Sequence, residues 1–282
     1  MRIDAHHHLW DLSVRPQPWQ AAEALAPLRR TFAFAELRPR LDAHGIDATV
    51  VVQSSSSLPE TRELLAQAAA SGGRIAGVVG WAALTDPAGL PGVLAELAAA
   101  GPLVGLRHQV QDEPDPRWLD RPEVRESLRA VGAAGAAYDL LVTPRELPAA
   151  ERAVRALPEV RFVLDHGGKP PVATGEREPW AAAVAALAGH PNVVCKLSGL
   201  VTEADWSAWR PADVLPYVRH LLDVFGPERV LFGSDWPVCT LAASYDQVVA
   251  LADEALQGLT PAERDAVLGG NAARVYRLAQ GG

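Results

Sequence analysis

Short, β-rich apolar runs alternate with longer Ala- and Leu-rich stretches along the whole chain, and this alternation limits the possible folds more than any other feature. Short runs that are apolar throughout are typical of strands covered on both faces. Repeated strand–helix units of this kind predict a parallel sheet. The eight candidate strands are residues 2–7, 48–53, 75–81, 103–108, 138–142, 161–166, 192–199 and 229–235.

Eight such units in 282 residues match the size and count of a (β/α)8 barrel, so we predict an α/β barrel fold with one domain over residues 1–282. An open, doubly wound sheet is the competing architecture, but no Gly-rich dinucleotide fingerprint follows the first strand. Residues 11–40 predict an extended loop with a short helix, and the SSSS at 54–57 predicts a loop. Helices are predicted over residues 87–101, 121–135, 148–158, 178–191, 211–225, 244–257 and 261–279.

Charge and composition exclude several classes of partner. The net charge is −8 and no basic run occurs, which argues against binding to nucleic acid or to an anionic membrane. No apolar run approaches the roughly 20 residues that span a bilayer, and no secretory signal is evident. Cys195 and Cys239 belong to no paired motif. We therefore expect a reduced, cytoplasmic protein that acts on a small molecule, with self-association into a homo-oligomer left open.

Polar residues gather where the predicted strands end. In a barrel of this type the carboxyl ends of the strands carry the active site, whereas chance would spread polar groups along strands and loops. The residues in question are His6, His8, Arg107, His108, Asp165, His166, Lys196 and Asp235.

Strand alternation separates the three adjacent histidines of the opening MRIDAHHHLW. Successive side chains point to opposite faces, so His6 and His8 share one face and His7 the other. The apolar Ile3 and Ala5, which fall on the face of His7, suit the side covered by helices. We therefore predict that His6 and His8 face the barrel axis.

The same reasoning applies to the later strands. It places His166 toward the axis and Asp165 away from it, where Asp165 could cap a helix. Lys196 toward the axis puts Cys195 outside, and Asp235 is also predicted to point inward.

Six segments together carry a family resemblance: DAHHHLW, GLRHQVQDEP (105–114), LDHGGKP (164–170), CKLSGL (195–200), LFGSDWPV (231–238) and GGNAARVYRL (269–278). In this order the chain resembles the amidohydrolase-related metal-dependent hydrolases, and within them the branch that hydrolyses sugar lactones such as L-fuconolactone. The resemblance implies a distorted (β/α)8 barrel and hydrolysis at a carbonyl group.

The resemblance also implies a set of metal ligands, which carry over to His6, His8, His166 and Asp235. Two features of the broader family are missing. YDLLVTP (138–144) contains no histidine at the fifth strand, and a carboxylated lysine has no counterpart. We therefore expect one divalent ion, zinc, rather than two. Because some lactonases of this group work without metal, a metal-free mechanism is the alternative.

Hydrolysis of a lactone needs an activated water, a polarised carbonyl and a proton for the leaving alkoxide. We assign Asp235 as the base that takes the water's proton and later returns it, with His166 and Arg107 also catalytic. Candidates for contact with a sugar ring or its hydroxyls are Lys196, His108, Trp10, Trp81 and Trp236. Two alternatives stay open, a metal-dependent decarboxylase of an aromatic acid and a non-catalytic barrel that binds a sugar acid.

Overall fold

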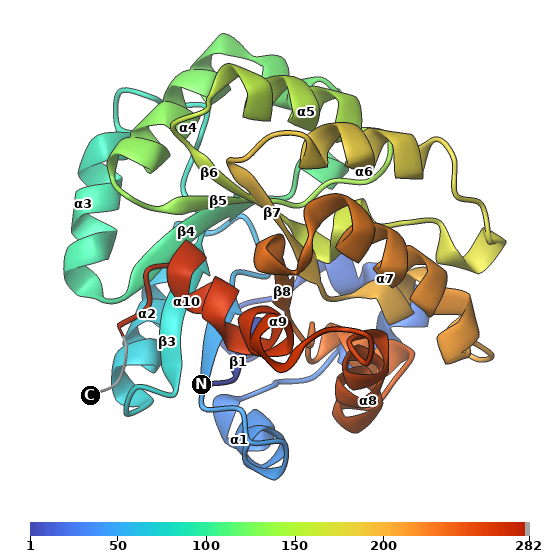
Figure 1. Cartoon of the computed structure of the whole chain (residues 1–282). Helices are drawn as coiled ribbons and strands as arrows, with labels where there is room; N and C mark the ends of the chain where they lie inside the picture. Colours follow the sequence, from blue (N-terminus) through green and yellow to red (C-terminus); the bar gives the residue numbers. More distant parts are fainter. Residues whose placement is uncertain (280–282) are drawn as a thin grey trace.

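The computed structural model describes residues 1–279 and contains eight parallel strands that neighbour one another in sequence order (Figure 1). All eight predicted strands are confirmed, and the fold is a (β/α)8 barrel. The strands are β1 Ile3–His7, β2 Ala48–Val52, β3 Ile75–Gly80, β4 Leu103–His108, β5 Ala137–Leu140, β6 Arg161–Leu164, β7 Val193–Leu197 and β8 Val230–Phe232. The barrel closes between β8 and β1, where the N–H of His8 donates a hydrogen bond to the carbonyl of Trp236 at 2.7 Å just beyond the two strands.

None of the described helices is long and apolar enough to cross a membrane. Helices follow the strands as predicted, with two differences, one at the helix after the second strand and one near the carboxyl end of the chain. The helices are α1 Phe34–Ala43, α2 Leu58–Ala70, α3 Leu90–Ala100, α4 Pro122–Ala133, α5 Leu147–Ala156, α6 Trp180–Ala188, α7 Pro211–Phe225, α8 Tyr245–Ala255, α9 Pro261–Asp265 and α10 Asn271–Val275.

The first difference is α2, which we did not predict and which starts directly after the four serines. Ser57 is its N-cap, and its hydroxyl accepts a hydrogen bond from the N–H of Glu60 at 3.3 Å. The second is the predicted helix 261–279, which is broken between α9 and α10. At that break a Cβ on Gly269 would lie 2.1 Å from the carbonyl oxygen of Met1, so the amino terminus packs there.

The barrel interior is apolar at one end and polar at the other. Aliphatic side chains from the strands form one buried cluster with residues of α10, which lies against the amino-terminal end of the barrel in Figure 1. Ala272, Val275 and Tyr276 belong to this cluster, so the carboxyl-terminal segment closes that end. The opposite end, where the strands finish, holds the charged residues described below.

Strand β1 departs from the alternation used above. Ile3 and Ala5 pack inside the barrel, whereas Asp4 points outward and accepts a hydrogen bond from the hydroxyl of Tyr245 in α8 at 3.1 Å. An irregular register between Asp4 and His7, a β-bulge, then brings His6 inward as well. The predicted inward direction of His6 and His8 is right, but the face assigned to Ile3 and Ala5 was wrong.

Strand β6 requires a second correction. Val163 packs in the interior, so regular alternation carries Asp165 inward, opposite to our prediction. His166 reaches the interior because residues 166–169 all have positive φ angles. On the next strand the prediction holds, since Lys196 points inward and Cys195 packs in the outer layer.

Candidate active site

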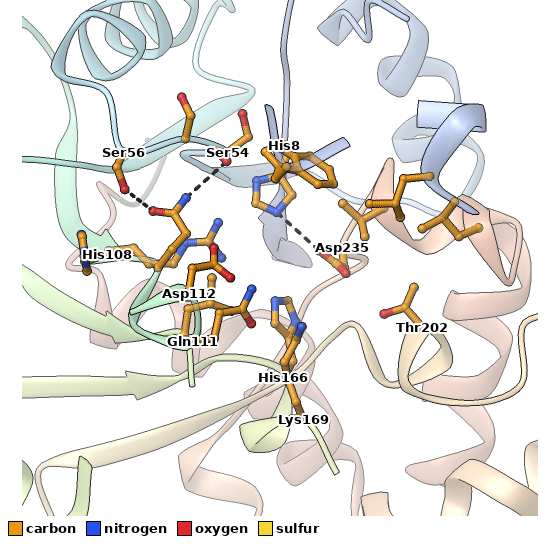
Figure 2. A pocket seen from close by; sticks show the side chains of 18 of the residues that line it. His8, Ser54, Ser56, His108, Gln111, Asp112, His166, Lys169, Thr202 and Asp235 are labelled. Atoms are coloured by element: carbon orange, nitrogen blue, oxygen red, sulfur yellow. Dashed lines mark hydrogen bonds and ion pairs between the residues drawn. The ribbon is translucent and has the colours of Figure 1, made fainter. Parts of the chain in front are cut away.

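A cavity of about 720 Å³ opens at the carboxyl ends of the strands. The ends of seven of the eight strands and the loops after them contribute to its wall, as expected for a barrel whose loops carry function. Figure 2 shows polar side chains from several of these loops converging on the cavity. Its lining includes Trp19, Leu25, residues 54–56, Arg107, His108, Gln109, residues 111–113, Lys169, Thr202, Glu203, Trp206 and Val238, together with His8, His166 and Asp235.

His6, His8 and Asp235 form a compact triad at the base of this cavity. The two Nε2 atoms lie 3.1 Å apart, and Asp235 Oδ1 lies 3.4 Å from His8 Nε2 and 3.7 Å from His6 Nε2. A tetrahedral ion with bonds of about 2.0–2.1 Å holds neighbouring ligand atoms roughly 3.3–3.4 Å apart. The three atoms therefore fit one zinc-sized ion.

The orientation of His8 also suits a ligand. Its Nδ1 lies 2.8 Å from the carbonyl oxygen of Val52, which can only accept, so Nδ1 carries the proton and Nε2 has a free lone pair. This arrangement leaves the Nε2 atom of His8 directed at Asp235, as Figure 2 shows.

His166, the fourth predicted ligand, belongs to a neighbouring group. His166, His6 and Asp165 lie close enough together to hold an ion. They form a second group beside the triad of His6, His8 and Asp235. The Nδ1 atom of His166 is 2.9 Å from the hydroxyl of Ser198, and the side chain lines the cavity. The structure thus brings all four predicted ligands to one place but divides them between two groups that share His6.

The conformation around His166 and Asp235 is unusual. Both have left-handed backbones, with φ of 54° and 58°, which non-glycine residues rarely adopt outside functional sites. Gly199 packs between them, since a Cβ there would lie 2.5 Å from His166 Nδ1 and 3.0 Å from Asp235 Oδ2. Glycine is therefore required for these two side chains to approach each other.

The charge states follow from burial and neighbours. Burial alone would raise the pKa of Asp235, but the nearby His166, His8 and Arg107 side chains outweigh it and lower the pKa. Burial lowers the pKa of His166 to about 4, and burial together with the nearby Lys196 holds the pKa of His6 well below its usual value. Asp235 is therefore ionised and both histidines are neutral at neutral pH.

A network of charges lies beneath the triad, and Lys196 is at its centre. Its Nζ is 2.5 Å from Asp139, 3.0 Å from Asp165 Oδ1 and 3.1 Å from His6 Nδ1. The side chain is completely buried and does not line the described cavity. We therefore correct its predicted contact with substrate: Lys196 supports His6 from below, because alternation on β7 turns it into the barrel.

Arg107 joins this network to the cavity. One guanidinium nitrogen is 3.0 Å from Asp165 Oδ2 and 3.4 Å from His6 Nε2, and the other donates to the carbonyl of Gln53 at 2.5 Å. The side chain also reaches the cavity wall. Arg107 therefore lies at the site as predicted, although most of its N–H groups face acceptors within the protein.

The predicted aromatic contacts need correction. Trp10 and Trp236 pack on either side of Phe32, with ring centroids 5.2 and 5.5 Å away, and neither lines the described cavity. The wall instead contains Trp19 and Trp206. Trp10 packs against Trp19 because the loop of residues 11–40 folds back over the strand end.

Trp81 is also outside the described cavity lining, but it holds His108, which is part of it. Its indole N–H donates to His108 Nδ1 at 3.0 Å, and His108 Nε2 lies 2.7 Å from Glu113. The histidine ring stacks on Trp118 at 4.4 Å. His108 is therefore at the cavity as predicted, fixed by three neighbours.

Sequence reasoning missed much of the cavity wall. Residues 111–113 were visible only as part of the motif GLRHQVQDEP, and the serines at 54–56 as a polar loop. The serine loop is rigid because Glu60 accepts hydrogen bonds from the N–H groups of Ser54 and Ser55, at 3.1 and 2.9 Å. Lys169 was visible only as part of the motif LDHGGKP, and Glu203 and Trp206 had no signal beyond their proximity to a strand end.

Fold and site together define a hydrolase-type barrel with a two-histidine, one-carboxylate centre, and comparison with known proteins agrees. Residues 3–278 match the family model described as amidohydrolase, and the chain belongs to that family.

Two curated relatives and two solved structures are close. The chain is 41% identical over 286 residues to L-fucono-1,5-lactonase of Burkholderia ambifaria, covering 98% of this chain and 96% of the relative. Identity to L-fucono-1,5-lactonase of Burkholderia multivorans is also 41%, with 99% and 96% covered. A crystal structure of a Burkholderia multivorans amidohydrolase with bound HEPES is 40% identical, with a TM-score of 0.93 and coverage of 99% and 100%. A second crystal form of an amidohydrolase from that organism contains bound Zn and has a TM-score of 0.90, with the same identity and coverage.

Proposed function

We propose that this chain is a lactonase that opens a sugar-acid lactone, with L-fucono-1,5-lactone as the first candidate substrate. The observation that carries the proposal is the triad of His6, His8 and Asp235 at the base of a large cavity. Relatives that are 41% identical over nearly the full chain carry the name L-fucono-1,5-lactonase. A cavity of about 720 Å³ has ample room for one six-membered lactone.

Asp235 serves as the base in this proposal. Its carboxylate is ionised, lines the cavity and lies beside the two histidines that would hold an ion. Lactone hydrolysis requires removal of a proton from water as its oxygen attacks C1, and Asp235 accepts that proton.

Arg107 and His166 act on the carbonyl end. Both line the cavity, and Arg107 brings a positive charge to the side where an oxyanion develops at C1. His166 is neutral and fixed through its bond to Ser198, so its other ring nitrogen is available to the substrate.

We assign one zinc ion to the triad of His6, His8 and Asp235. When bound, a zinc ion supplies Lewis acidity and lowers the pKa of a coordinated water to about 7. The protein's part is to keep His6 neutral by burial, to orient His8 through Val52 and to hold His6 in place above Lys196.

The proposal is tested by base consumption with a panel of aldono-1,5-lactones, L-fucono-1,5-lactone among them. The wild-type protein should consume base, and Asp235→Asn should lower kcat by at least about 100-fold, the scale of general acid–base catalysis. Carbon dioxide release from hydroxybenzoates would instead indicate a decarboxylase. Inactivity in both assays, with ligand affinity unchanged in Asp235→Asn, would indicate a non-catalytic sugar-acid-binding barrel.

The metal assignment has its own test. Protein purified without a tag should contain about one equivalent of zinc by elemental analysis, and chelation should abolish activity. Less than a tenth of an equivalent, with activity that survives the chelator, would favour the metal-free mechanism, in which Asp235 acts as the base directly and the histidines polarise the carbonyl.

Two broader expectations stay predictions, one folding domain and a cytoplasmic location, and self-association into a homo-oligomer stays open. Calorimetric unfolding, cell fractionation and analytical ultracentrifugation test these three points in turn.

A further inference from the structure

The chain carries almost all of its positive charge on arginine. Of 26 lysines and arginines only two are lysines, Lys169 and Lys196, and both lie at the candidate site. An ammonium group differs from a guanidinium group in being compact and in being able to release a proton near neutral pH. Lys196 is enclosed by Asp139, Asp165 and His6, whereas Lys169 lines the cavity.

A strained turn puts Lys169 on the cavity wall. Residues 166–169 have φ angles of 54°, 59°, 71° and 53° in succession, a run of left-handed backbone in which only the middle two residues are glycine. Such conformations cost free energy and persist where the surrounding structure enforces them. The turn directs both His166 and Lys169 to the cavity, as Figure 2 shows.

Lys169 has one protein partner among the described residues. Its Nζ lies 3.3 Å from a carboxylate oxygen of Glu203, in the loop after β7, and both side chains are about three-quarters buried. The same loop carries Ser198 and Gly199, which contact the side chain of His166. One carboxylate occupies only part of an ammonium with three protons, so the others can reach a substrate.

The other cationic or proton-bearing groups on the described cavity wall have different roles or partners. His166 is assigned above to the carbonyl end of the substrate, and His8 uses its ring proton in the bond to Val52. Arg107 is bound to Asp165, and a guanidinium does not release its proton. His108 accepts a hydrogen bond from Trp81 at Nδ1 and faces Glu113 at Nε2.

Taken with the proposed lactonase function, on which this inference rests, these contacts single out one group. We propose that Lys169 is the acid that protonates the leaving ring oxygen, with Glu203 as its positioning residue. When the tetrahedral adduct collapses, the bond between C1 and the ring oxygen breaks, its electron pair stays on that oxygen, and Lys169 Nζ gives it a proton.

The proton balance then closes without a further reagent. Asp235 holds the proton taken from water, and that proton returns to the neutral amine of Lys169 through solvent in the cavity. The carboxylic acid product loses its own proton, so one lactone and one water become one hydroxy acid anion and one proton.

The experiment compares two substrates in the full-length protein: a sugar 1,5-lactone and its analogue with sulfur as the ring atom. A thiolate leaves without protonation, whereas an alkoxide does not. Lys169→Arg keeps the charge that faces Glu203 but removes the transferable proton, and Lys169→Met removes both. We expect both variants to lose at least about 100-fold in kcat on the oxygen lactone and less than about fivefold on the thiolactone.

Thr202→Val is the matched control, because Thr202 lines the same cavity from the same loop as Glu203 and supplies no acid. It should change kcat for the two substrates by the same factor. Equal losses on both substrates in the Lys169 variants, or full activity of Lys169→Arg, would overturn the inference and return the acid role to Asp235.

Chemical rescue gives a second readout. Methylammonium should restore kcat of Lys169→Ala on the oxygen lactone, and guanidinium at the same concentration should not. Rescue by both ions would show that Lys169 contributes only its positive charge and transfers no proton. Thermal unfolding of each variant checks that it is folded. A wild-type protein that hydrolyses no lactone would refute the proposed function itself, which is a different outcome from an active enzyme indifferent to Lys169.

Discussion

The two lysines, Lys196 and Lys169, lie in two regions of the site that differ in burial and in the elements that hold them. Around Lys196 every charged group lies inside the barrel, is completely buried and touches a charge of opposite sign. Around Lys169 the residues come from loops and keep part of their surface in the cavity. The buried region therefore positions the histidines of the triad, and the loop region is left to contact a substrate.

This difference arises from where the strands end. Side chains of the strands themselves, such as those of Asp139 and Lys196, are held by the barrel on all sides. Side chains beyond the strand ends depend on their loops for position. Changes in the buried region should hence reduce stability, and changes in the loop region should alter kinetics with little cost in stability.

The largest effect is expected from Lys196→Met. It leaves Asp139 and Asp165 buried without their shared cation, and breaking a buried ion pair in this way costs about 3–5 kcal/mol. Denaturant unfolding measures the loss, and Lys169→Met, which removes the more exposed lysine, should cost less than about 1 kcal/mol. Equal losses in the two variants would erase the distinction between the regions.

The next largest effect is expected from acid, through His166, which is buried at the wall of the cavity. Burial lowers the pKa of His166 from 6.5 to about 4, so between these values the unfolded chain binds a proton that the folded chain does not. The free energy of unfolding is therefore undiminished above about pH 6.5 and falls by about 3 kcal/mol for this group as the pH drops toward 4.

Unfolding measured at several pH values in the presence of a chelator tests this slope. His166→Asn should flatten it, whereas His44→Asn, in the outer helical layer, should leave it nearly unchanged. A slope that is the same in both variants would show that His166 is not held neutral by burial.

Gly199→Ala should have an intermediate effect, on activity and on stability. The added methyl would lie 2.5 Å from His166 Nδ1, and φ at this position is +62°, so we expect a loss of about 1–3 kcal/mol and of at least about tenfold in kcat. Gly175→Ala is the control, since its φ is +73° but nothing lies within 4 Å. It should cost about 1 kcal/mol and leave kcat unchanged.

The smallest effect on stability is expected from Trp206→Ala in the loop region. Its side chain lines the cavity wall, and its loss should raise KM for a sugar lactone by about 2- to 13-fold, the effect of losing one aromatic contact. The midpoint of thermal unfolding should shift by no more than a few degrees. A large loss of stability with an unchanged KM would place Trp206 among the structural residues instead.

Strand alternation predicted the direction of side chains correctly on a regular strand and failed where the backbone is irregular. Strand positions followed from apolar composition, and Lys196 and Cys195 took the predicted faces on β7 because that strand is regular. Local rules failed at β1, where a bulge intervenes, and at β6, where Asp165 turned out to be inside. Both irregularities serve the site, since each moves a histidine that alternation alone would misplace.

The cavity wall was harder to predict for a different reason. Trp10, Trp81 and Trp236 lie within a few residues of strand ends, yet none of them lines the described cavity, while Trp19 reaches it from farther along the chain. Loop conformation depends on distant contacts such as those between Glu60 and the serine loop. Local patterns in the sequence do not predict these contacts.

The sequence by itself determined the number and order of the strands, the end of the barrel that carries the polar residues, and the histidines and carboxylate that form the triad. These features follow from composition and period along a single segment. Only the tertiary structure decided which lysine is enclosed and which faces the cavity, because that depends on the bulge in β1, the left-handed turn after β6 and the packing of Gly199. Each of these is set by contacts between segments that lie far apart along the chain.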